Sequence, residues 1–157
     1  MISSEKKIIG VAALKKELSA LRKAGRTIAF TNGCFDLMHV GHVTYLQKAK
    51  KGNRVLVVGL NSDQSIHRIK GPSRPIVHQK SRAAVLFALA CVDFVVLFNK
   101  ETPYALIKTL RPDVLIKGAD YKGQKVVGSD LVKRTELIAL VKGFSTSKIV
   151  AKIKKYG

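Results

Sequence analysis

The chain alternates two patterns of apolar residues. Some segments are apolar at intervals of three and four residues, the spacing of one helix face, and others are apolar at nearly every position. The helical pattern predicts helices over residues 11–21, 40–51, 81–91, 103–110 and 145–153. The continuous pattern predicts strands over residues 27–31, 54–60, 94–98, 114–116 and 137–141. Strands that alternate with helices are typical of an α/β fold, an open and mostly parallel sheet with helices on both faces.

Local signals mark where some of these elements start and stop. Thr102 is a good N-cap residue, and Pro103 after it suits the first helical position. Residues 61–63 (Asn-Ser-Asp) form a turn and cap signal, and the glycine and prolines within residues 70–77 predict a loop. Ligands in such sheets bind at the carboxyl ends of the strands, near the point where the strand order reverses. The sequence therefore places its chemistry in the loops over residues 32–39, 61–63, 117–123 and 142–147.

The composition is that of one ordinary domain. The chain has 157 residues, 46% of them apolar, without a Pro/Gly/Ser-rich linker or an internal repeat, which predicts a single domain over residues 1–157. The apolar runs are too short for a membrane span, and residues 1–7 lack the layout of a signal peptide. Cys34 and Cys91 are too few for a disulfide framework and indicate reduced thiols. These features predict a cytoplasmic protein that does not insert into membranes.

Charge changes this picture. The chain has 29 Lys and Arg residues against 10 Asp and Glu residues, a formal net charge of +19, which favours anionic partners. Nucleic acid is one such partner. The lysines are scattered, however, and the four Tyr and six Phe side chains do not interleave with them as a base-stacking platform requires. The pattern is more typical of a lysine-rich surface on a protein that handles small phosphates.

The strongest chemical signal follows the first predicted strand, at residues 31–42 (Thr-Asn-Gly-Cys-Phe-Asp-Leu-Met-His-Val-Gly-His). Gly33 permits a tight turn beside a ligand. His39 and His42 are three residues apart and share one face of the first helical turn, and Gly41 between them lets a ligand approach the backbone. With the free N–H groups of the helix N-terminus, these residues predict a phosphate cradle that contains two imidazoles.

Three interpretations of the two histidines are open. They could bind an α-phosphate and stabilise the charge that develops when a phosphoryl or nucleotidyl group is transferred. They could bind zinc together with Cys34, although a fourth ligand is missing and the spacing is not that of a zinc finger or ribbon. They could also be ordinary surface histidines at a helix start. The strand–turn–helix context favours the first interpretation.

A second candidate phosphate site lies near the end of the chain. Gly143 and Phe144 precede three hydroxyl residues (145–147, Ser-Thr-Ser) at a predicted helix start, and Lys148 adds charge. Hydroxyl and backbone N–H groups there can hold a β- or γ-phosphate. Ser145 or Thr146 could instead only cap the helix. A triphosphate needs a second cradle beside the first, which favours the phosphate interpretation.

The two motifs together read Asn-Gly-Cys-Phe-Asp over residues 32–36 with His39-x-Gly-His42, and Phe-Ser-Thr-Ser-Lys-Ile over residues 144–149. In this form the chain resembles the cytidylyltransferase-like nucleotidyltransferase superfamily, whose signatures are HxGH and a later ISTT-type motif. Further segments resemble one branch, the D-glycero-β-D-manno-heptose 1-phosphate adenylyltransferases: residues 61–63, 70–75, 81–86, 111–121 and 127–130. The resemblance runs from about residue 11 to residue 153. It implies a Rossmann-like fold of the HIGH-superfamily type.

The resemblance also implies a reaction. AMP passes from ATP to the sugar phosphate, which releases pyrophosphate and gives ADP-heptose for lipopolysaccharide core synthesis. Mg²⁺ is implied as the companion of the nucleotide triphosphate, without a protein ligand assigned to it, and so are a homo-oligomer and a separate heptose kinase that supplies the acceptor. Because the acceptor phosphate is itself the nucleophile, no serine or cysteine nucleophile is needed.

Site residues follow from the resemblance, position by position. His39 and His42 would bind the nucleotide phosphates and stabilise the transition state, with Lys70 and Arg82 as further catalytic cations. The other nucleotide-binding positions would be Thr31, Asn32, Gly33, Cys34, Phe35, Gly41, Gly118, Asp120, Gly143, Phe144, Ser145, Thr146 and Ser147. The acceptor would be bound by Asp36, Asp63, Lys70 and Arg74. Without a ligand, Arg82 has a simpler interpretation as a surface helix residue, Asp63 as a helix cap and Lys70 as a solvated loop charge.

The chain also departs from the branch. Ala119 stands where the branch has a second glycine, Lys142 stands where it has glutamate, and residues 133–140 form a shorter segment. These departures bear on the choice of base and sugar rather than on the class of reaction. The open alternatives are a CTP-dependent glycerol-3-phosphate cytidylyltransferase and, from another class, a non-catalytic nucleic-acid-binding protein on the same scaffold.

Overall fold

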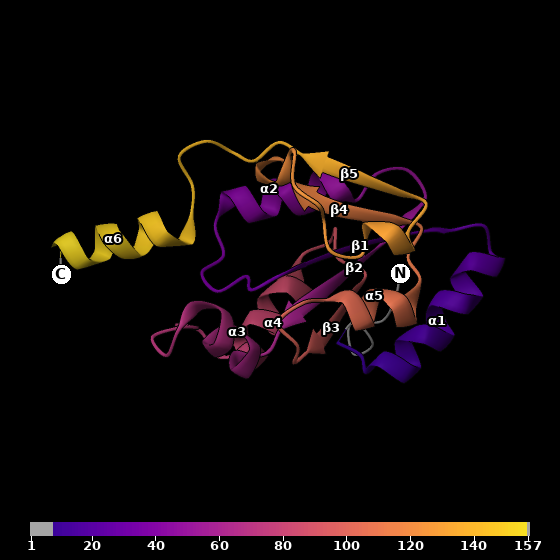
Figure 1. Cartoon of the computed structure of the whole chain (residues 1–157), viewed down its shortest axis with the longest axis horizontal. Coiled ribbons are helices and arrows are strands. Elements are labelled where there is room, and N and C mark those ends of the chain that lie inside the picture. Colours follow the sequence, from indigo (N-terminus) through magenta and orange to yellow (C-terminus); the bar gives the residue numbers. More distant parts are fainter. Residues whose placement is uncertain (1–7, 157) are drawn as a thin grey trace.

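The fold is built around a parallel sheet (Figure 1). The computed structural model describes residues 8–156, and within them the sheet has five strands. They are β1 (Thr27–Gly33), β2 (Arg54–Asn61), β3 (Phe94–Phe98), β4 (Val114–Gly118) and β5 (Arg134–Ile138). Their order is β3-β2-β1-β4-β5, and every neighbouring pair is parallel. The predicted α/β class and parallel sheet are confirmed.

Helices cover both faces of the sheet. They are α1 (Val11–Lys23), α2 (Val40–Ala49), α3 (Asp63–Lys70), α4 (Gln79–Ala88), α5 (Tyr104–Leu110) and α6 (Thr146–Tyr156), with short 3₁₀ turns η2 (Ala119–Tyr121) and η3 (Ser129–Leu131). On one face, Leu14 of α1 and Ile107 of α5 share a core cluster with Phe30 of β1. On the other face, Leu46 of α2 and Leu86 of α4 belong to a second cluster. Because the central strands are buried on both faces, they appear in the sequence as continuous apolar runs.

Several boundaries differ from the prediction, and three of them concern β5, α4 and α5. β5 covers residues 134–138 and not 137–141. It is an edge strand that pairs with β4 alone, so polar residues such as Glu136 are tolerated there and a search for apolar runs places the strand too late. α4 ends at Ala88 rather than at residue 91. Pro103 occupies the N-cap position of α5, so Thr102 does not cap this helix as predicted.

Ser62 starts a helix that the sequence marked only as a turn and cap signal. Its hydroxyl accepts a hydrogen bond of 3.1 Å from the N–H of Ser65 and so caps α3. Gly71 ends the helix with φ +89°, a conformation that glycine adopts without strain. This short helix follows β2 and ends at Lys70.

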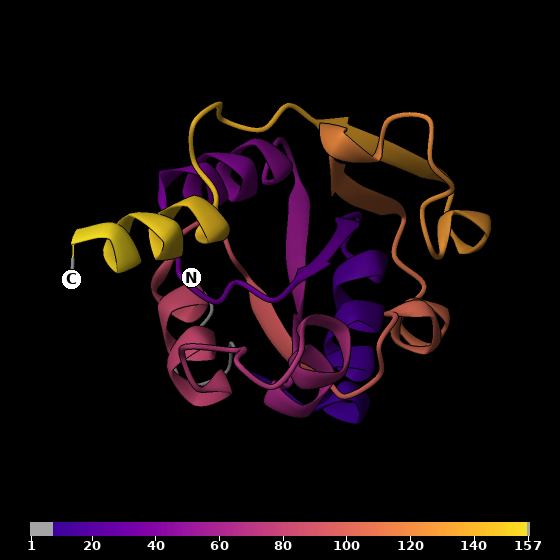
Figure 2. The same ribbon diagram turned by 60° about the vertical axis from the view of Figure 1, so that its left-hand side comes forward.

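The strand order reverses at β1, which lies between β2 and β4. In an open parallel sheet, a crevice forms outside the carboxyl ends of the strands at such a point. α6 extends away from the sheet (Figures 1 and 2), and none of its residues is buried. Among residues 8–156, no helix combines the length and the apolar character that a bilayer crossing needs.

Candidate active site

A cavity of about 570 Å³ opens at the carboxyl edge of the sheet. Its wall is formed by the β1–α2 loop, the ends of α3 and β4, η2 and the start of α6. The predicted site residues in this wall are Asn32, Gly33, Cys34, Phe35, Asp36, His39, Gly41, His42, Lys70, Gly118, Asp120, Phe144, Ser145, Thr146 and Ser147. The structure therefore brings the first motif and the second motif together in one place, beside the reversal of strand order.

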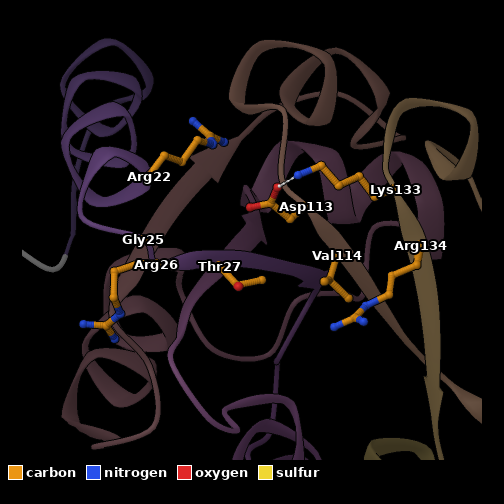
Figure 3. Close-up of a pocket in the computed structure, with 8 residues that line it drawn as sticks. All are labelled: Arg22, Gly25, Arg26, Thr27, Asp113, Val114, Lys133 and Arg134. Carbon is orange, nitrogen blue, oxygen red and sulfur yellow. Dashed lines mark hydrogen bonds and ion pairs between the residues drawn. The ribbon is translucent and has the colours of Figure 1, made fainter.

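A second cavity, of about 450 Å³, lies at the opposite edge of the sheet (Figure 3). Its cations are engaged by the fold itself. Arg22 donates hydrogen bonds to the carbonyl groups of Leu110 and Arg111. Lys133 forms an ion pair with Asp113 at 2.8 Å, and Figure 3 draws this pair. Ligands of such sheets bind at the carboxyl edge, whereas this cavity lies at the amino ends of the strands. The cavity at the carboxyl edge is therefore the candidate active site.

His39 and His42 stack against each other in the wall of this site. His39 occupies the N-cap position of α2, and the two ring centroids lie 3.9 Å apart at an interplanar angle of 24°. Phe35 and Phe144 flank the pair, with centroid distances of 5.3 Å to His42 and 6.3 Å to His39. A Cβ atom on Gly41 would lie 2.9 Å from atoms of the His39 ring. Glycine at this position therefore makes room for the stacked pair.

Burial keeps both imidazoles neutral near pH 7. It lowers the pKa of His39 below its usual value. It lowers the pKa of His42 to about 4, and the neighbouring His39 and Lys70 act in the same direction. In both rings Nδ1 is buried and has no hydrogen-bond partner among the residues that the structure describes. Nε2 is then the nitrogen left to meet a ligand, and a neutral ring protonated there donates one hydrogen bond.

The start of α6 contributes hydroxyl and N–H groups to the same cavity. Ser145 Oγ accepts a hydrogen bond of 3.2 Å from the N–H of Lys148, so Ser145 caps the helix. Thr146 Oγ1 donates a weak hydrogen bond of 3.5 Å to the carbonyl of Leu37 in the β1–α2 loop. Two helix starts, those of α2 and α6, thus border one cavity. Their partial positive charges favour an anionic ligand.

Lys117, which the sequence analysis did not select, lines the cavity from the end of β4. Its Nζ donates a hydrogen bond of 2.5 Å to Oδ1 of Asn32, across the pair β1–β4. Burial lowers the pKa of Lys117 to about 8, although the charge of Asp120 opposes this shift. One signal could have found it: a charged residue closes an otherwise apolar strand, at the edge where ligands bind.

The carboxylate of Asp36 is committed to the fold. It lines the cavity, but it accepts hydrogen bonds from the backbone N–H groups of Ile76 and Val77, both at 2.9 Å, and from Arg74 at 2.9 Å. Burial alone would raise the pKa of Asp36, but these hydrogen bonds outweigh it, so the pKa lies below its usual value. Arg74 itself lies outside the cavity wall. The pair anchors the loop after Lys70 to the β1–α2 loop. Binding of the acceptor by these two residues stays a prediction.

Arg82 and Asp63 also lie outside the cavity wall. Arg82 is 1% exposed and not a surface residue. Its guanidinium donates to Asp63 Oδ1 at 2.7 Å and to the carbonyl groups of Cys34 and Val77 at 2.5 and 2.9 Å. Arg82 therefore links α3, the β1–α2 loop and the start of α4. The resemblance implied a different role for it, a cation that faces phosphate. Every polar contact that the structure gives its side chain is internal.

Three further predicted residues have less direct positions. Thr31 is buried outside the cavity wall, with its hydroxyl 2.8 Å from that of Tyr45. Gly143 turns the chain before α6 with φ +89° and is not in the wall. Cys34 is in the wall, and burial raises the pKa of its thiol. A raised pKa favours the thiol over the nucleophilic thiolate, which agrees with a reaction that needs no cysteine nucleophile.

Sequence reasoning missed part of the wall. The missed residues are Tyr45, Asn61, Ile69, Glu101, Lys117, Tyr121, Leu140 and Val141. Most of these belong to segments without a motif, and only the folding of the chain brings them to the cavity. No three His, Cys, Asp or Glu side chains within residues 8–156 are placed to hold a metal ion, so the zinc interpretation with Cys34 finds no support.

Comparison with known proteins places the chain in context. It matches the cytidylyltransferase-like family over residues 30–152. It is 55% identical over 145 residues to the bifunctional protein HldE of Syntrophotalea carbinolica and 54% identical over 151 residues to that of Wolinella succinogenes. These alignments cover 90% and 96% of this chain but 30% and 32% of the relatives, so the chain spans about a third of their length.

A solved structure is also similar. The lipopolysaccharide core biosynthesis protein from Thermoplasma volcanium is 27% identical, with a TM-score of 0.54 over 83% of this chain and 88% of that one. The family match spans both the histidine pair and the start of α6, which the fold has brought to one cavity. The resemblance inferred from the two motifs is confirmed, and the chain belongs to the cytidylyltransferase-like family.

Proposed function

We propose that the protein is a nucleotidyltransferase that passes AMP from ATP to D-glycero-β-D-manno-heptose 1-phosphate and releases pyrophosphate. The observation that carries this proposal is the stacked pair of neutral histidines, which lines one cavity with the start of α6. Identity of about 54% to proteins named HldE supports the heptose branch. The name of the structural neighbour, a lipopolysaccharide core biosynthesis protein, points the same way.

The chemistry suits a site without a protein nucleophile. An oxygen of the sugar phosphate forms a bond to the α-phosphorus of ATP, and the bond from that phosphorus to the pyrophosphate oxygen breaks. The protein must bring two anions into line and stabilise the charge of the departing group. In our proposal, His39 and His42 donate hydrogen bonds from Nε2 to phosphate oxygens, and the starts of α2 and α6 add partial positive charge.

The acceptor side follows from the position of α3. Lys70 ends this helix, is exposed and lines the cavity, so we assign it to the phosphate of the sugar. Asp36 and Arg82 act indirectly, because they fix the loops that carry the site. Lys70 is thus the cation of the acceptor side, and Arg82 is a positioning residue.

Mg²⁺ fits this cavity as a companion of the nucleotide. The ion usually takes one or two carboxylates and completes its shell with phosphate oxygens and water. Asp120 would hold it on the protein side, since Asp36 is engaged by Arg74 and Glu101 lies 3.9 Å from Arg68. When bound, the ion neutralises charge on the triphosphate and on the departing pyrophosphate.

The reaction needs a supply of sugar 1-phosphate. We propose that a heptose kinase provides it, either on another polypeptide or in another segment of the same one. The relatives named HldE are called bifunctional and are about three times as long as this chain. We also propose that the protein is cytoplasmic and that it forms a homo-oligomer.

The test is pyrophosphate release by the purified protein with Mg²⁺. ATP and CTP are each crossed against heptose 1-phosphate and glycerol 3-phosphate. Release with ATP and heptose 1-phosphate alone is the expected result. Release with CTP and glycerol 3-phosphate would keep the site and replace the substrates. Silence in every pairing, together with salt-dependent binding to DNA or RNA, would overturn the enzymatic proposal in favour of nucleic-acid binding.

A further inference from the structure

Lys117 differs from the other cation in the cavity wall by its burial. It is 7% exposed at the carboxyl end of β4, whereas Lys70 is exposed at the end of α3. The pleat of β4 and the neighbouring strand β1 fix its position, because its Nζ is held by Oδ1 of Asn32 at 2.5 Å. The sheet therefore fixes the position of the Lys117 ammonium group, whereas Lys70 is exposed to solvent.

The hydrogen bonds of Lys117 are incomplete. An ammonium group has three donors, and the structure provides one acceptor, the amide oxygen of Asn32. No carboxylate within residues 8–156 lies in ion-pair distance of Lys117. Asp120 interacts with it only at longer range, and the ring of Tyr121 lies 5.2 Å from its Nζ. A buried charge in this condition destabilises the fold unless something compensates it.

The buried arginines of the described chain show what a structural cation looks like here. Arg54 is 3% exposed and is paired with Glu136, and Arg82 is 1% exposed and is paired with Asp63. Neither arginine lines the cavity. Lys117 is also buried, but it has no carboxylate within ion-pair distance among the described residues and it lines the site. Unlike the two arginines, Lys117 therefore leaves its charge available to an anion in the cavity.

We propose that Lys117 is a binding residue for the triphosphate of the nucleotide, held in place by Asn32 and donating to phosphate oxygens beside the stacked histidines. This inference rests on the proposed function, because it takes a nucleoside triphosphate as the anion. The phosphate-binding cation of the site is then Lys117, at the end of β4. The resemblance had assigned such a role to Arg82. Asn32 becomes a positioning residue for Lys117, with no need to touch the nucleotide.

The test measures binding without any acceptor present. Isothermal titration with inorganic tripolyphosphate, and separately with ATP, compares the native protein with Lys117→Met, Lys117→Arg and Lys125→Met. Lys125 is the matched control, because it is exposed in the loop after η2, lies outside the cavity wall and carries the same charge. Lys117→Met should weaken binding of both ligands about 10- to 100-fold, the worth of hydrogen bonds to a charged group. Lys117→Arg should recover much of the loss, and Lys125→Met should change little.

Several outcomes overturn the inference. One is equal affinity for tripolyphosphate in the native protein and in Lys117→Met. A second is an equal loss of affinity in Lys125→Met, which would show a general effect of net charge. A third is the absence of tripolyphosphate binding to the native protein. If Lys117→Met does not fold, the native protein still provides the answer. Reductive methylation mapped by mass spectrometry should then show Lys117, and not Lys125, protected by tripolyphosphate, and no protection would refute the inference.

Failure of this inference and failure of the proposed function have different signatures. Pyrophosphate release in the substrate crosses, combined with unchanged tripolyphosphate binding in Lys117→Met, would remove the role of Lys117 and keep the reaction. Loss of binding in Lys117→Met, combined with silence in every cross, would keep Lys117 as a triphosphate ligand and remove the proposed reaction.

Discussion

At the scale of single residues, the proposed reaction would depend on His39 and His42, two imidazole rings that the fold keeps neutral. A neutral ring protonated on Nε2 can donate to a phosphate oxygen and does not carry a proton into the reaction. The stacked arrangement also prevents both rings from being charged at once, because two cations with centroids 3.9 Å apart would repel each other. In the proposed reaction the pair would therefore act as fixed hydrogen-bond donors.

Replacement of either histidine by alanine should lower turnover strongly without unfolding the protein. Loss of one donor to the transition state typically lowers the rate about 100- to 1000-fold. We expect His39→Ala and His42→Ala to show such a fall in kcat for pyrophosphate release. Circular dichroism and thermal unfolding are the controls. Turnover near that of the native protein in either variant would remove that ring from the mechanism.

His42 should make the stability of the protein depend on pH. Its pKa is about 4 in the folded state, against a usual value of about 6.5 in an unfolded chain. Between these values the unfolded state binds more protons, so the free energy of unfolding falls as the pH drops from 7 towards 4. Urea unfolding at pH 5 and pH 7.5 should show a larger loss in the native protein than in His42→Gln. Equal losses in both proteins would contradict the assignment.

The sequence located the motif residues of the site but not all of its charges. The histidines and the hydroxyl residues were predictable because each lies at a recognisable helix start after a strand. The internal role of Arg82 was not predictable, because its partners Cys34 and Val77 depend on how two loops meet. Lys117 lies in the predicted loop over residues 117–123, but no residue type or spacing in that loop singled it out, because its burial and its contact with Asn32 depend on how β1 and β4 pair.

At the scale of elements, the loop after α3 is held to the sheet by one carboxylate. Asp36 accepts hydrogen bonds from two backbone N–H groups of that loop and from Arg74. Its side chain is 5% exposed, so these bonds form away from water. The position of Lys70 relative to the histidines is therefore set through this anchor.

Removal of that charge should loosen the anchor. Asp36→Asn leaves Arg74 with a weaker partner in a poorly hydrated place, and we expect about 3 kcal/mol less free energy of unfolding. Urea unfolding measures the change. Asp130→Asn is the control, because Asp130 is exposed and contacts Tyr104 at the surface, and it should change stability by less than about 0.5 kcal/mol. Unchanged stability in Asp36→Asn with lost activity would return Asp36 to direct ligand binding.

Most elements were predictable because their pattern is dictated by burial. β3 has the predicted bounds, and β1, β2 and β4 each extend the predicted strand by one or two residues at the carboxyl end. Those last residues, such as Asn32 and Lys117, are polar because they face the cavity, which is why an apolar pattern stops short of them. β5 was displaced for the opposite reason, since an edge strand has less need for apolar residues.

At the scale of the whole molecule, the net charge of +19 would attract both proposed substrates. A triphosphate and a sugar phosphate are attracted over a distance that salt shortens, from about 14 Å at 50 mM to about 4 Å at 500 mM ionic strength. Attraction of this kind raises the encounter rate and the affinity, whereas contacts inside the cavity are screened less. The field and the site therefore respond differently to ionic strength.

Salt should separate these two contributions. Raising NaCl from about 50 to about 500 mM should raise the KM for ATP severalfold and leave kcat within about twofold, because screening acts mainly on exposed charges. Sucrose at equal osmolality is the control and should change neither constant. A fall in kcat as large as the rise in KM would show that salt reaches the transition state itself.

The arrangement of α6 has a mechanical consequence. Its first turn borders the cavity, while the remainder extends from the sheet as a rod of 11 residues, about 16 Å long. If this rod turned by about 10° around Ser145, its tip at Tyr156 would move by about 3 Å, and Ser147 by about 0.5 Å. Residues far from Ser145 thus move much more than residues in the first turn of α6. A large movement at the end of α6 therefore displaces the residues beside the cavity by much less than the length of a hydrogen bond.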